Sequence, residues 1–451
     1  MIHCFKIKTR NLVLDVESGA LHQVDDAAME ILLQMQNACG DSSQALLREL
    51  QETSPRLYSE IRALMEAGQL FSRPLTSDVH QHMENRKPVV KALCLHMAHE
   101  CNLRCAYCFA GEGNYSLTDR GLMPLEVGKR ALDFLVKESG ARRNLEVDFF
   151  GGEPMLNFDV VKELVAYGRS IEGPAGKKFR FTLTTNGALL TEDAVAYINQ
   201  NMDNVVLSLD GRPSVNDRMR KNQNGSGSYA KIFPKIKGLA DAREQKNYYV
   251  RGTFTRYNLD FAEDVLHLAD AGFKNISVEP VVAPADADYA LREEDLPVLF
   301  DEYEKLAEAL LERERAGKGF LFFHFEMNLD GGPCIAKRVT GCGAGSEYLA
   351  VTPSGKLYPC HQFVGDERFQ ADDLGKGFSS NDIVREFEHC HVFAKPECAA
   401  CWARYYCSGG CMATAFYAND SILKPDKISC ELMRKRIECA LYIFAERSER
   451  N

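Results

Sequence analysis

The sequence has no apolar run of roughly 18 residues or more, the length at which a membrane-spanning helix becomes a candidate. Its N-terminus, MIHCFKIKTRNLVLDV, lacks the basic start, long apolar stretch and small-residue cleavage site of a secretory signal. Positive charge is also scarce. The formal net charge is -10 at pH 7, whereas sequence-independent nucleic-acid binding depends on clustered Lys and Arg. We therefore expect a cytoplasmic protein whose partners include neither membranes nor nucleic acid.

Nothing in the composition indicates a disordered chain. Hydrophobic residues make up 45% and charged residues 26%, which are ordinary values for a globular protein. The length of 451 residues exceeds the ~250 to 300 residues at which one hydrophobic core stops growing. Two or three domains are therefore expected.

The cysteine content is unusual for a cytosolic chain. The sequence has 16 cysteines, and in a reducing compartment closely spaced thiols are metal ligands or catalytic groups more often than disulfides. Five of them stand apart from any motif and are interpreted as small buried hydrophobes. These are Cys4, Cys39, Cys94, Cys390 and Cys439. The other eleven form one group near residue 100 and another between residues 334 and 430.

The first 85 residues predict a compact winged-helix-like module. Alternating segments at 4–8, 12–16 and 21–24 favour strands, and helical periodicity follows at 27–36, 44–51 and 57–67. Asp25 and Asp26 suit a helix N-cap, and Pro55 suits a first helical turn. No catalytic constellation is visible, so a structural or peptide-binding role is predicted. Residues 72–88 have the character of a polar linker.

Between residues 90 and 290 apolar strands alternate with amphipathic helices. This pattern predicts a parallel sheet with helices outside, as an open sheet or a barrel. Candidate functional residues follow several strands, which favours the barrel. A helical bridge at 296–314 leads to a C-terminal third that is poor in long periodic segments, as expected where metal holds the chain. The predicted strands are 92–97, 145–150, 179–185, 205–209, 248–255 and 276–282.

The first cysteine group lies in the loop HECNLRCAYCFAGEG, after the first of these strands. Cys101, Cys105 and Cys108 form a Cys-x3-Cys-x2-Cys array. Three thiolates this close can hold one iron–sulfur cubane and leave its fourth iron open to substrate or cofactor. A zinc site remains the alternative, because His96 and His99 are near enough to complete one.

This array resembles the signature of the radical S-adenosylmethionine (SAM) superfamily. The resemblance implies a 4Fe–4S cluster whose open iron binds the amino and carboxylate groups of SAM. Tyr107 takes the aromatic position that packs near the adenine, and the segment GGEP ends the second strand. Glycines there allow close backbone approach, and a carboxylate can accept from the cofactor ammonium. The implied SAM contacts are Tyr107, Gly151, Gly152, Glu153, Asn186, Ser208, Asp210, Arg220 and Glu279.

The second group exceeds what one cubane can use, so it predicts two further clusters. Its spacing resembles the SPASM domain, which implies one cluster held by Cys398, Cys401, Cys407 and Cys430. Cys342, Cys360 and Cys411 would hold the other. Cys334 either completes that second cluster or is a small buried thiol. Two structural zinc sites are the alternative for the whole group.

Nearly the full length resembles the SCIFF-peptide maturases, which belong among the sactipeptide and ranthipeptide maturases. The segments LDVESGALHQVDD, CLHMAHECNLRCAYCFAGEG and TGCGAGSEYLAVTPSGKLYPCHQF carry the likeness. It implies an α/β fold with a leader-peptide recognition element at 1–85, a partial (β/α)6 radical SAM barrel at 86–315 and a SPASM domain at 316–451.

The implied activity is that of an oxidoreductase that joins a cysteine sulfur to a carbon of an acceptor residue, commonly threonine. The substrate is a ribosomally made Cys-rich precursor peptide with a leader, and the reductant is a protein such as flavodoxin or ferredoxin. His361 could take the cysteine proton, although a structural histidine is the more ordinary interpretation. The alternatives are formylglycine formation, carbon–carbon crosslinking, epimerisation and a non-enzymatic cluster or zinc scaffold that binds peptides.

Overall fold

The fold is taken from a computed structural model of the chain. The structure describes residues 1–37, 41–74, 79, 83, 89–115, 121–327, 335–374 and 382–449. Most of the predicted linker, together with Cys39 and Cys334, lies outside these residues.

The N-terminal unit is an antiparallel sheet covered by helices. Its strands β1 (Ile2–Ile7), β2 (Arg10–Asp15) and β3 (Leu21–Val24) pair in chain order. The helices α1 (Asp26–Asn37), α2 (Asp41–Thr53) and α3 (Pro55–Glu66) follow. The Asp25 carboxylate caps α1 by accepting from the amide of Ala28 at 2.8 Å, and Pro55 opens α3. All six elements were predicted from the sequence.

The centre of the molecule is a ten-stranded, largely parallel sheet. The six predicted strands are confirmed, and they lie side by side in chain order. β12 (Leu321–Phe322) extends the sheet beyond the sixth of them. The six are β4 (Ala92–Ala98), β6 (Asn144–Gly151), β7 (Lys178–Thr185), β8 (Asn204–Ser208), β10 (Tyr248–Phe254) and β11 (Asn275–Pro280).

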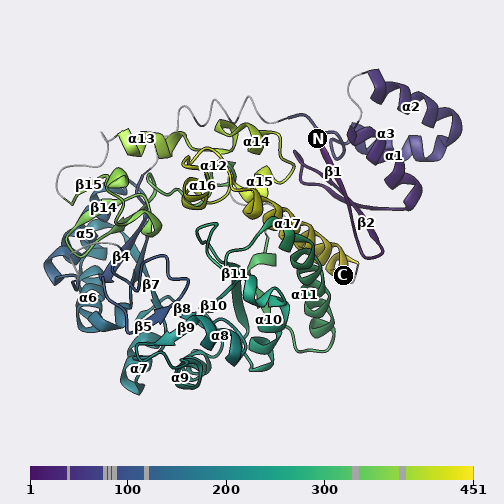
Figure 1. Ribbon diagram of the computed structural model, residues 1–451. Coiled ribbons are helices and arrows are strands. Elements are labelled where there is room, and N and C mark those ends of the chain that lie inside the picture. The colour runs from purple at the N-terminus through teal and green to yellow at the C-terminus, as the bar shows by residue number, and fades with distance from the viewer. Residues whose placement is uncertain are drawn as a thin grey trace.

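Amphipathic helices cover the outer side of these strands (Figure 1). In α5, for example, Val127, Ala131 and Leu135 recur at helical spacing and are buried. Burying such a stripe against a sheet is the main source of stability for a helix of this length. The covering helices are α5 (Leu125–Glu138), α6 (Phe158–Ala175), α7 (Glu192–Asn201), α9 (Tyr229–Ala242), α10 (Phe261–Asp270) and α11 (Leu296–Arg315).

The C-terminal segment completes the same sheet. β13 (Tyr348–Val351) lies parallel to β4, and β14 (Lys356–Tyr358) and β15 (Asp372–Asp373) continue from it in antiparallel pairs. Within the described residues, strand pairing ends at β12 on one side and at β15 on the other. The paired strands therefore form an open sheet, and the partial barrel stays a prediction.

The C-terminal third, which was expected to be poor in long periodic segments, ends in one long helix. α17 (Lys427–Ser448) packs on α11 and touches β1 and β3. Because it lies between these elements, it buries residues on several sides and shows no single apolar stripe. The short elements are β5 (Leu103–Cys105), α8 (Pro213–Met219), β9 (Arg220–Asn222), α12 (Ile335–Thr340), α13 (Asp382–His389), α14 (Pro396–Ala399), α15 (Arg404–Cys407) and α16 (Met412–Asn419).

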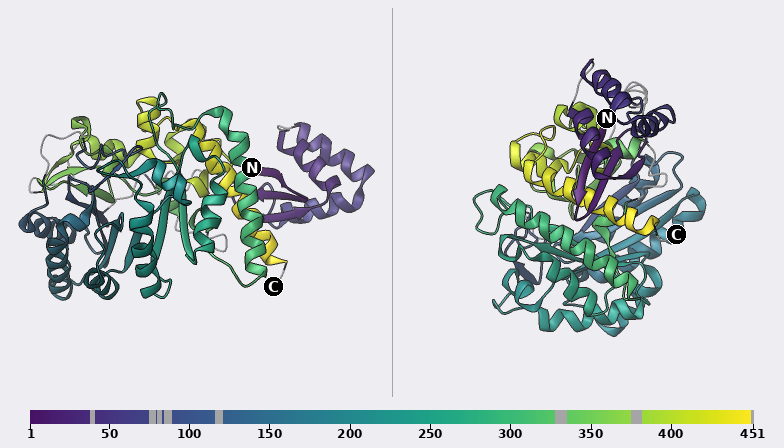
Figure 2. Two further views of the ribbon diagram at one scale, coloured as in Figure 1. Left: turned by 60° about the horizontal axis from the view of Figure 1, so that its bottom comes forward. Right: turned by 90° about the vertical axis from the view of Figure 1, so that its right-hand side faces the viewer.

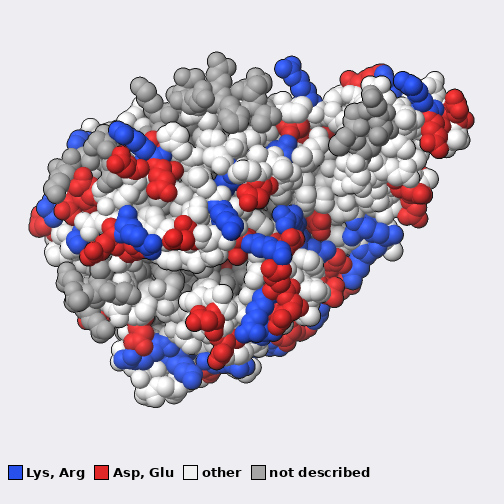
Figure 3. Space-filling view, turned by 45° about the horizontal axis from the view of Figure 1, so that its top comes forward, with Lys and Arg blue, Asp and Glu red and all other residues white. Residues whose placement is uncertain are grey.

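The N-terminal unit projects from one end of the molecule, with its sheet beside α17 and its helices farther out (Figure 2). On the face shown in Figure 3, basic and acidic side chains of the described residues are intermingled. No helix among the described residues combines the length and the apolar character needed to cross a bilayer.

Candidate active site

A cavity opens at the carboxyl ends of the parallel strands. It encloses about 1270 Å³, including the part open to solvent. Strand ends and the loops after them gather at one edge of such a sheet, which is why residues far apart in sequence meet there. The cavity is lined by the three clustered cysteines and by all but one of the predicted SAM contacts, namely Cys101, Cys105, Cys108, Tyr107, Gly151, Gly152, Glu153, Asn186, Ser208, Arg220 and Glu279.

The cysteine loop is held by a small ribbon that the sequence did not indicate. β5, which contains Cys105, pairs antiparallel with β9, and Cys105 lies opposite Arg220. The amide nitrogen of Leu103 lies 3.5 Å from the Cys101 sulfur. Asn186 reaches the same loop, where its Nδ2 lies 3.7 Å from the Cys101 sulfur. The loop is therefore fixed by two distant segments of the chain.

The two glycines of GGEP are needed because β6 ends against that loop. A Cβ on Gly151 would lie 2.5 Å from the carbonyl oxygen of Ala98, and φ there is +116°. A Cβ on Gly152 would lie 2.1 Å from the carbonyl oxygen of Glu100. No side chain fits at these distances. The end of β6 can therefore lie this close to the cysteine loop only because both residues are glycine.

Glu153 is a fully buried carboxyl at the floor of the cavity. It accepts from the Thr185 hydroxyl at 2.8 Å, from the Asn186 amide at 2.8 Å and from the Met155 amide at 3.1 Å. Burial raises the pKa of Glu153 to about 7, although these hydrogen bonds oppose the rise. A carboxyl with this pKa changes charge readily when a cation binds beside it.

The Tyr107 hydroxyl is hydrogen-bonded to one acidic and one basic side chain. Its hydroxyl donates to Asp210 at 2.7 Å and accepts from the Arg220 guanidinium at 2.6 Å. Asp210 also accepts from the Thr253 amide at 3.1 Å. Asp210 is fully buried and is not among the residues that line the cavity, so its contact with SAM stays a prediction.

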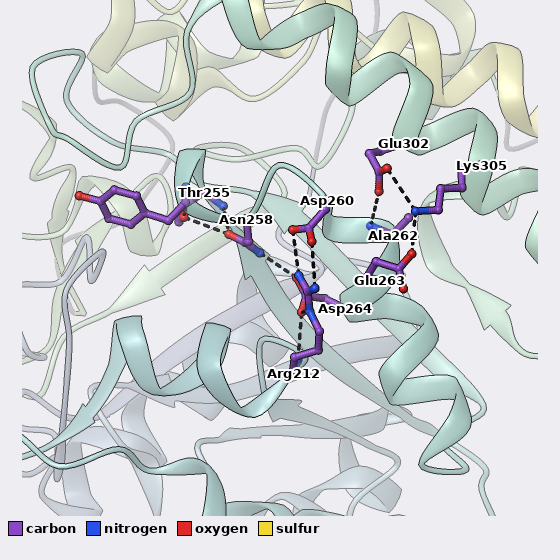
Figure 4. Close-up of polar contacts among 10 residues, drawn as sticks. Arg212, Thr255, Asn258, Asp260, Ala262, Glu263, Asp264, Glu302 and Lys305 are labelled. Carbon is purple, nitrogen blue, oxygen red and sulfur yellow. Dashed lines mark hydrogen bonds and ion pairs between the residues drawn. The ribbon is translucent and has the colours of Figure 1, made fainter.

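A network of charged side chains anchors the loop that carries Asp210 to α10 and to the residues just before it (Figure 4). Asp264 on α10 accepts from the Arg212 amide at 3.0 Å and from its Nε at 2.8 Å. Asn258 donates to the other oxygen of Asp264 at 3.0 Å. Asp260 binds the outer edge of the Arg212 guanidinium at 2.8 and 2.9 Å. The network ties the end of β8 to the start of α10.

We expect Asp264→Asn to lower the free energy of unfolding by about 2 to 3 kcal/mol, because it leaves buried donors and a guanidinium without their charged acceptor. The matched control is Asp260→Asn. The Asp264 side chain is 0% exposed and the Asp260 side chain 52%, so the control should lose less than about 1 kcal/mol. Thermal unfolding followed by circular dichroism compares the two. Equal losses would contradict the argument from burial.

Glu279 belongs to a second charged group on the cavity wall. Arg251 on β10 donates to Glu279 at 3.2 Å, and His324 lies 4.0 Å away. Burial alone would raise the pKa of Glu279, but Arg251 and the neighbouring cations lower it to about 2. Glu279 is therefore ionised at neutral pH.

Several cavity residues were missed by the sequence reasoning. Arg251 and Thr253 point into the cavity from β10, and Phe150 does so from β6. Thr253 and Phe150 lie near the ends of predicted strands, although no motif marked them, whereas Arg251 lies in the middle of its strand. His361 also lines the cavity, with its Nδ1 3.2 Å from the Tyr348 hydroxyl.

The C-terminal cysteines form a separate cavity. Its lining includes Cys398, Cys401, Cys407 and Cys430, the four that the sequence assigned to one cluster. The Cys401 sulfur accepts from the Ala403 amide at 3.4 Å. In the second predicted set, burial raises the pKa of Cys360, and the thiols of Cys411 and Cys342 add to the rise. Among the described residues, no three His, Cys, Asp or Glu side chains converge as a single metal ion would require.

Residues 95–245 match the model of the Radical SAM superfamily. The mycofactocin maturase MftC of Mycolicibacterium smegmatis is 26% identical to this chain over 349 residues, which cover 74% of this chain and 81% of the relative. The match to the superfamily model includes the cysteine loop and the GGEP segment.

Two solved structures share the fold. Native anSMEcpe with bound AdoMet and the Kp18Cys peptide matches with a TM-score of 0.67 at 20% identity, over 80% of this chain and 99% of its own. SuiB of Streptococcus suis, bound to the precursor peptide SuiA, matches with a TM-score of 0.55 at 16% identity, over 95% of this chain and 98% of its own. Residues 95–245 therefore resemble a radical SAM domain, in a chain that is also similar to a maturase.

Proposed function

We propose that this protein is a radical SAM maturase that forms thioether bonds between cysteine sulfurs and a carbon of an acceptor residue, commonly threonine, in a ribosomally made Cys-rich peptide. The observation that supports a radical SAM enzyme is that Cys101, Cys105, Cys108 and the buried carboxyl of Glu153 line one cavity. The resemblance of nearly the full sequence to the SCIFF-peptide maturases supports the thioether product.

The donor set of the cavity fits the two cofactors. Cys101, Cys105 and Cys108 would hold a 4Fe–4S cluster by three thiolates. Glu153 would accept from the ammonium of SAM, and Tyr107, fixed by Asp210 and Arg220, would lie against its adenine. When bound, this cofactor pair supplies the removal of hydrogen from an unactivated carbon.

The chain itself orients the peptide and limits the access of water. Phe109, Phe150 and Val282 give the cavity an apolar wall beside its charged groups. The Arg251–Glu279 pair on the same wall can hold a peptide amide or carboxyl by charge-assisted hydrogen bonds. The C-terminal cysteines would hold two further clusters, and a protein such as flavodoxin or ferredoxin would supply electrons.

The N-terminal unit is proposed to capture the leader of the peptide, either as a strand added to its sheet or in a groove along its helices. The division into a recognition element at 1–85, a barrel at 86–315 and a SPASM domain at 316–451 is part of this proposal. The boundary at 315 falls at the end of α11.

The test is to reconstitute the full chain without oxygen and to measure iron and zinc. Reductant, SAM and a candidate Cys-rich peptide are then added for mass analysis. About twelve irons per chain, cleaved SAM and a peptide lighter by two hydrogens per crosslink are expected. Zinc in place of iron without cleavage of SAM would leave a binding scaffold. Iron and cleavage with another mass change would keep the enzyme class and replace the thioether.

Formylglycine formation is the second candidate, since the fold also matches anSMEcpe bound to a peptide. That match leaves about a fifth of this chain uncovered, whereas SuiB covers 95% of it. The two products differ because a thioether retains the cysteine sulfur, whereas oxidation of cysteine to formylglycine removes it. The mass of the product peptide therefore separates them.

We expect the affinity for SAM to rise as the pH increases through about 7. Below that pH Glu153 carries a proton, and the ammonium of SAM binds the ionised carboxylate better, so binding releases a proton. Glu153→Gln should weaken binding about 10-fold or more and remove this dependence. Equilibrium dialysis between about pH 6 and pH 8 measures both effects.

Thr185→Val is the matched variant for this prediction. It removes one hydrogen bond to the Glu153 carboxylate, which raises the pKa of Glu153 further. The pH midpoint of SAM binding should therefore move upward while the dependence persists. A midpoint that does not respond to either variant would assign the dependence to another group.

A further inference from the structure

The N-terminal sheet covers the chain segment between Cys401 and Cys407. The ring of His3 on β1 stacks on Trp402, with centroids 3.7 Å apart and planes within 5°. The phenol oxygen of Tyr406 lies next to Gly19, where an added Cβ would meet it at 3.5 Å. Two of the residues between the cysteines are thus held by the first 20 residues of the chain.

Glu17, in the turn between β2 and β3, makes the most buried of these contacts. Its carboxylate pairs with the Arg404 guanidinium and accepts from the Tyr405 hydroxyl at 3.0 Å. The Glu17 side chain is 2% exposed and the Arg404 side chain 6%. Val16, Tyr405 and Cys398 also belong to one apolar cluster, so the packing around the pair is shared between the two parts of the chain.

Arg404 connects this contact to the cysteines. It lines the same cavity as Cys398, Cys401, Cys407 and Cys430, and its Nη1 donates to the carbonyl oxygen of Cys401 at 3.1 Å. Glu17 does not line that cavity. The cation is therefore nearer to the thiols than the carboxylate that balances it.

We propose that Glu17 is a positioning residue for an iron–sulfur cluster on these four cysteines. It fixes Arg404 and Tyr405, and through them the spacing of Cys401 and Cys407, and it balances the charge of Arg404 beside the cluster. The N-terminal unit is thus part of the C-terminal metal site as well as a peptide-binding module. This inference rests on the proposed function, which assigns a cluster to these cysteines.

The charges of Glu17 and Arg404 predict the direction in which each substitution should shift the midpoint potential of the cluster. An unbalanced cation near a cluster favours its reduced, more negative form in a poorly screened site. Glu17→Gln should therefore raise the midpoint potential of this cluster. Arg404→Gln removes the nearer cation and should lower it, whether or not Glu17 then takes up a proton. A purely structural effect on the loop would not give shifts of opposite sign.

The experiment uses the reconstituted full chain, with redox titrations followed by electron paramagnetic resonance and with iron measured per chain. Arg10→Gln is the matched control, because Arg10 ties the same N-terminal sheet to Glu446 of α17 and to Glu449 directly after it, each at 2.7 Å. The expected result is a raised potential in Glu17→Gln, a lowered one in Arg404→Gln and no shift in Arg10→Gln. Shifts of one sign in all three variants, or in none, would overturn the proposal.

The double variant Glu17→Gln/Arg404→Gln keeps the test open if a single variant does not fold, since it leaves no unpaired charge. Its potential should lie below that of the wild type, and an unchanged potential contradicts the proposal. Failure of the proposed function looks different. Wild-type protein that holds zinc in place of iron would remove both proposals, whereas only about four irons per chain would remove the cluster on these four cysteines and this proposal alone.

Discussion

Cys105→Ala should abolish cleavage of SAM and remove about four irons per chain, the content of one cubane. Cys105 lines the cavity with Cys101 and Cys108, and two thiolates from this loop cannot replace three. A cluster on Cys398, Cys401, Cys407 and Cys430 should remain, because these four thiols line a separate cavity. Iron analysis and chromatography of SAM products under reducing conditions measure both effects.

The control for this prediction is Cys94→Ala. Cys94 is a buried cysteine of β4, one strand upstream of the loop, and it lines no part of the cavity. The control should keep its iron and its SAM cleavage and lose about 1 kcal/mol of stability through lost packing. If Cys94→Ala lost iron as Cys105→Ala does, the division between ligands and buried hydrophobes would be wrong.

Gly152→Ala should reduce SAM cleavage by at least about 100-fold, although it adds one methyl group to a residue that carries no chemistry. The Cβ would overlap the carbonyl of Glu100, so the backbone that carries Cys101 must shift. A displacement of about 1 Å at a reacting centre costs that much in rate. Single-turnover cleavage assays on reconstituted protein provide the measurement.

Gly238→Ala is the matched control. Gly238 lies inside α9, and an added Cβ there would meet nothing within 4 Å. This variant should be as active as the wild type and slightly more stable, by about 0.5 to 1 kcal/mol. Normal cleavage in Gly152→Ala would show that the loop can move away without loss.

The parts of this fold that follow local patterns were predictable. Strand and helix periods located the six central strands and the N-terminal elements, and cysteine spacing located the loop on the cavity. These signals lie within a few neighbouring residues, so no knowledge of the folded chain is required. α17 was missed for the converse reason: it is buried on several sides and lacks the stripe that marks a helix.

The details of the site depend on contacts between distant segments. Nothing in the sequence near Cys105 shows that β9 will pair with it and bring Arg220 across. Likewise, Asp210 follows β8 as expected, but its carboxylate accepts from the Tyr107 hydroxyl and does not line the cavity. A strand-end position predicts that a residue lies near a site, and only the three-dimensional arrangement decides whether it faces the ligand or supports a neighbour that does.

The pairing of β13 with β4 has a consequence for biosynthesis. At translation rates of about 5 to 20 residues per second, roughly 10 to 50 s pass between the appearance of β4 and that of its partner. During that interval the nascent chain presents an unpaired edge, the kind of surface that recruits strands from other molecules. Chaperones that shield this edge should therefore improve the yield of the full chain, and fragments that end before β13 should aggregate.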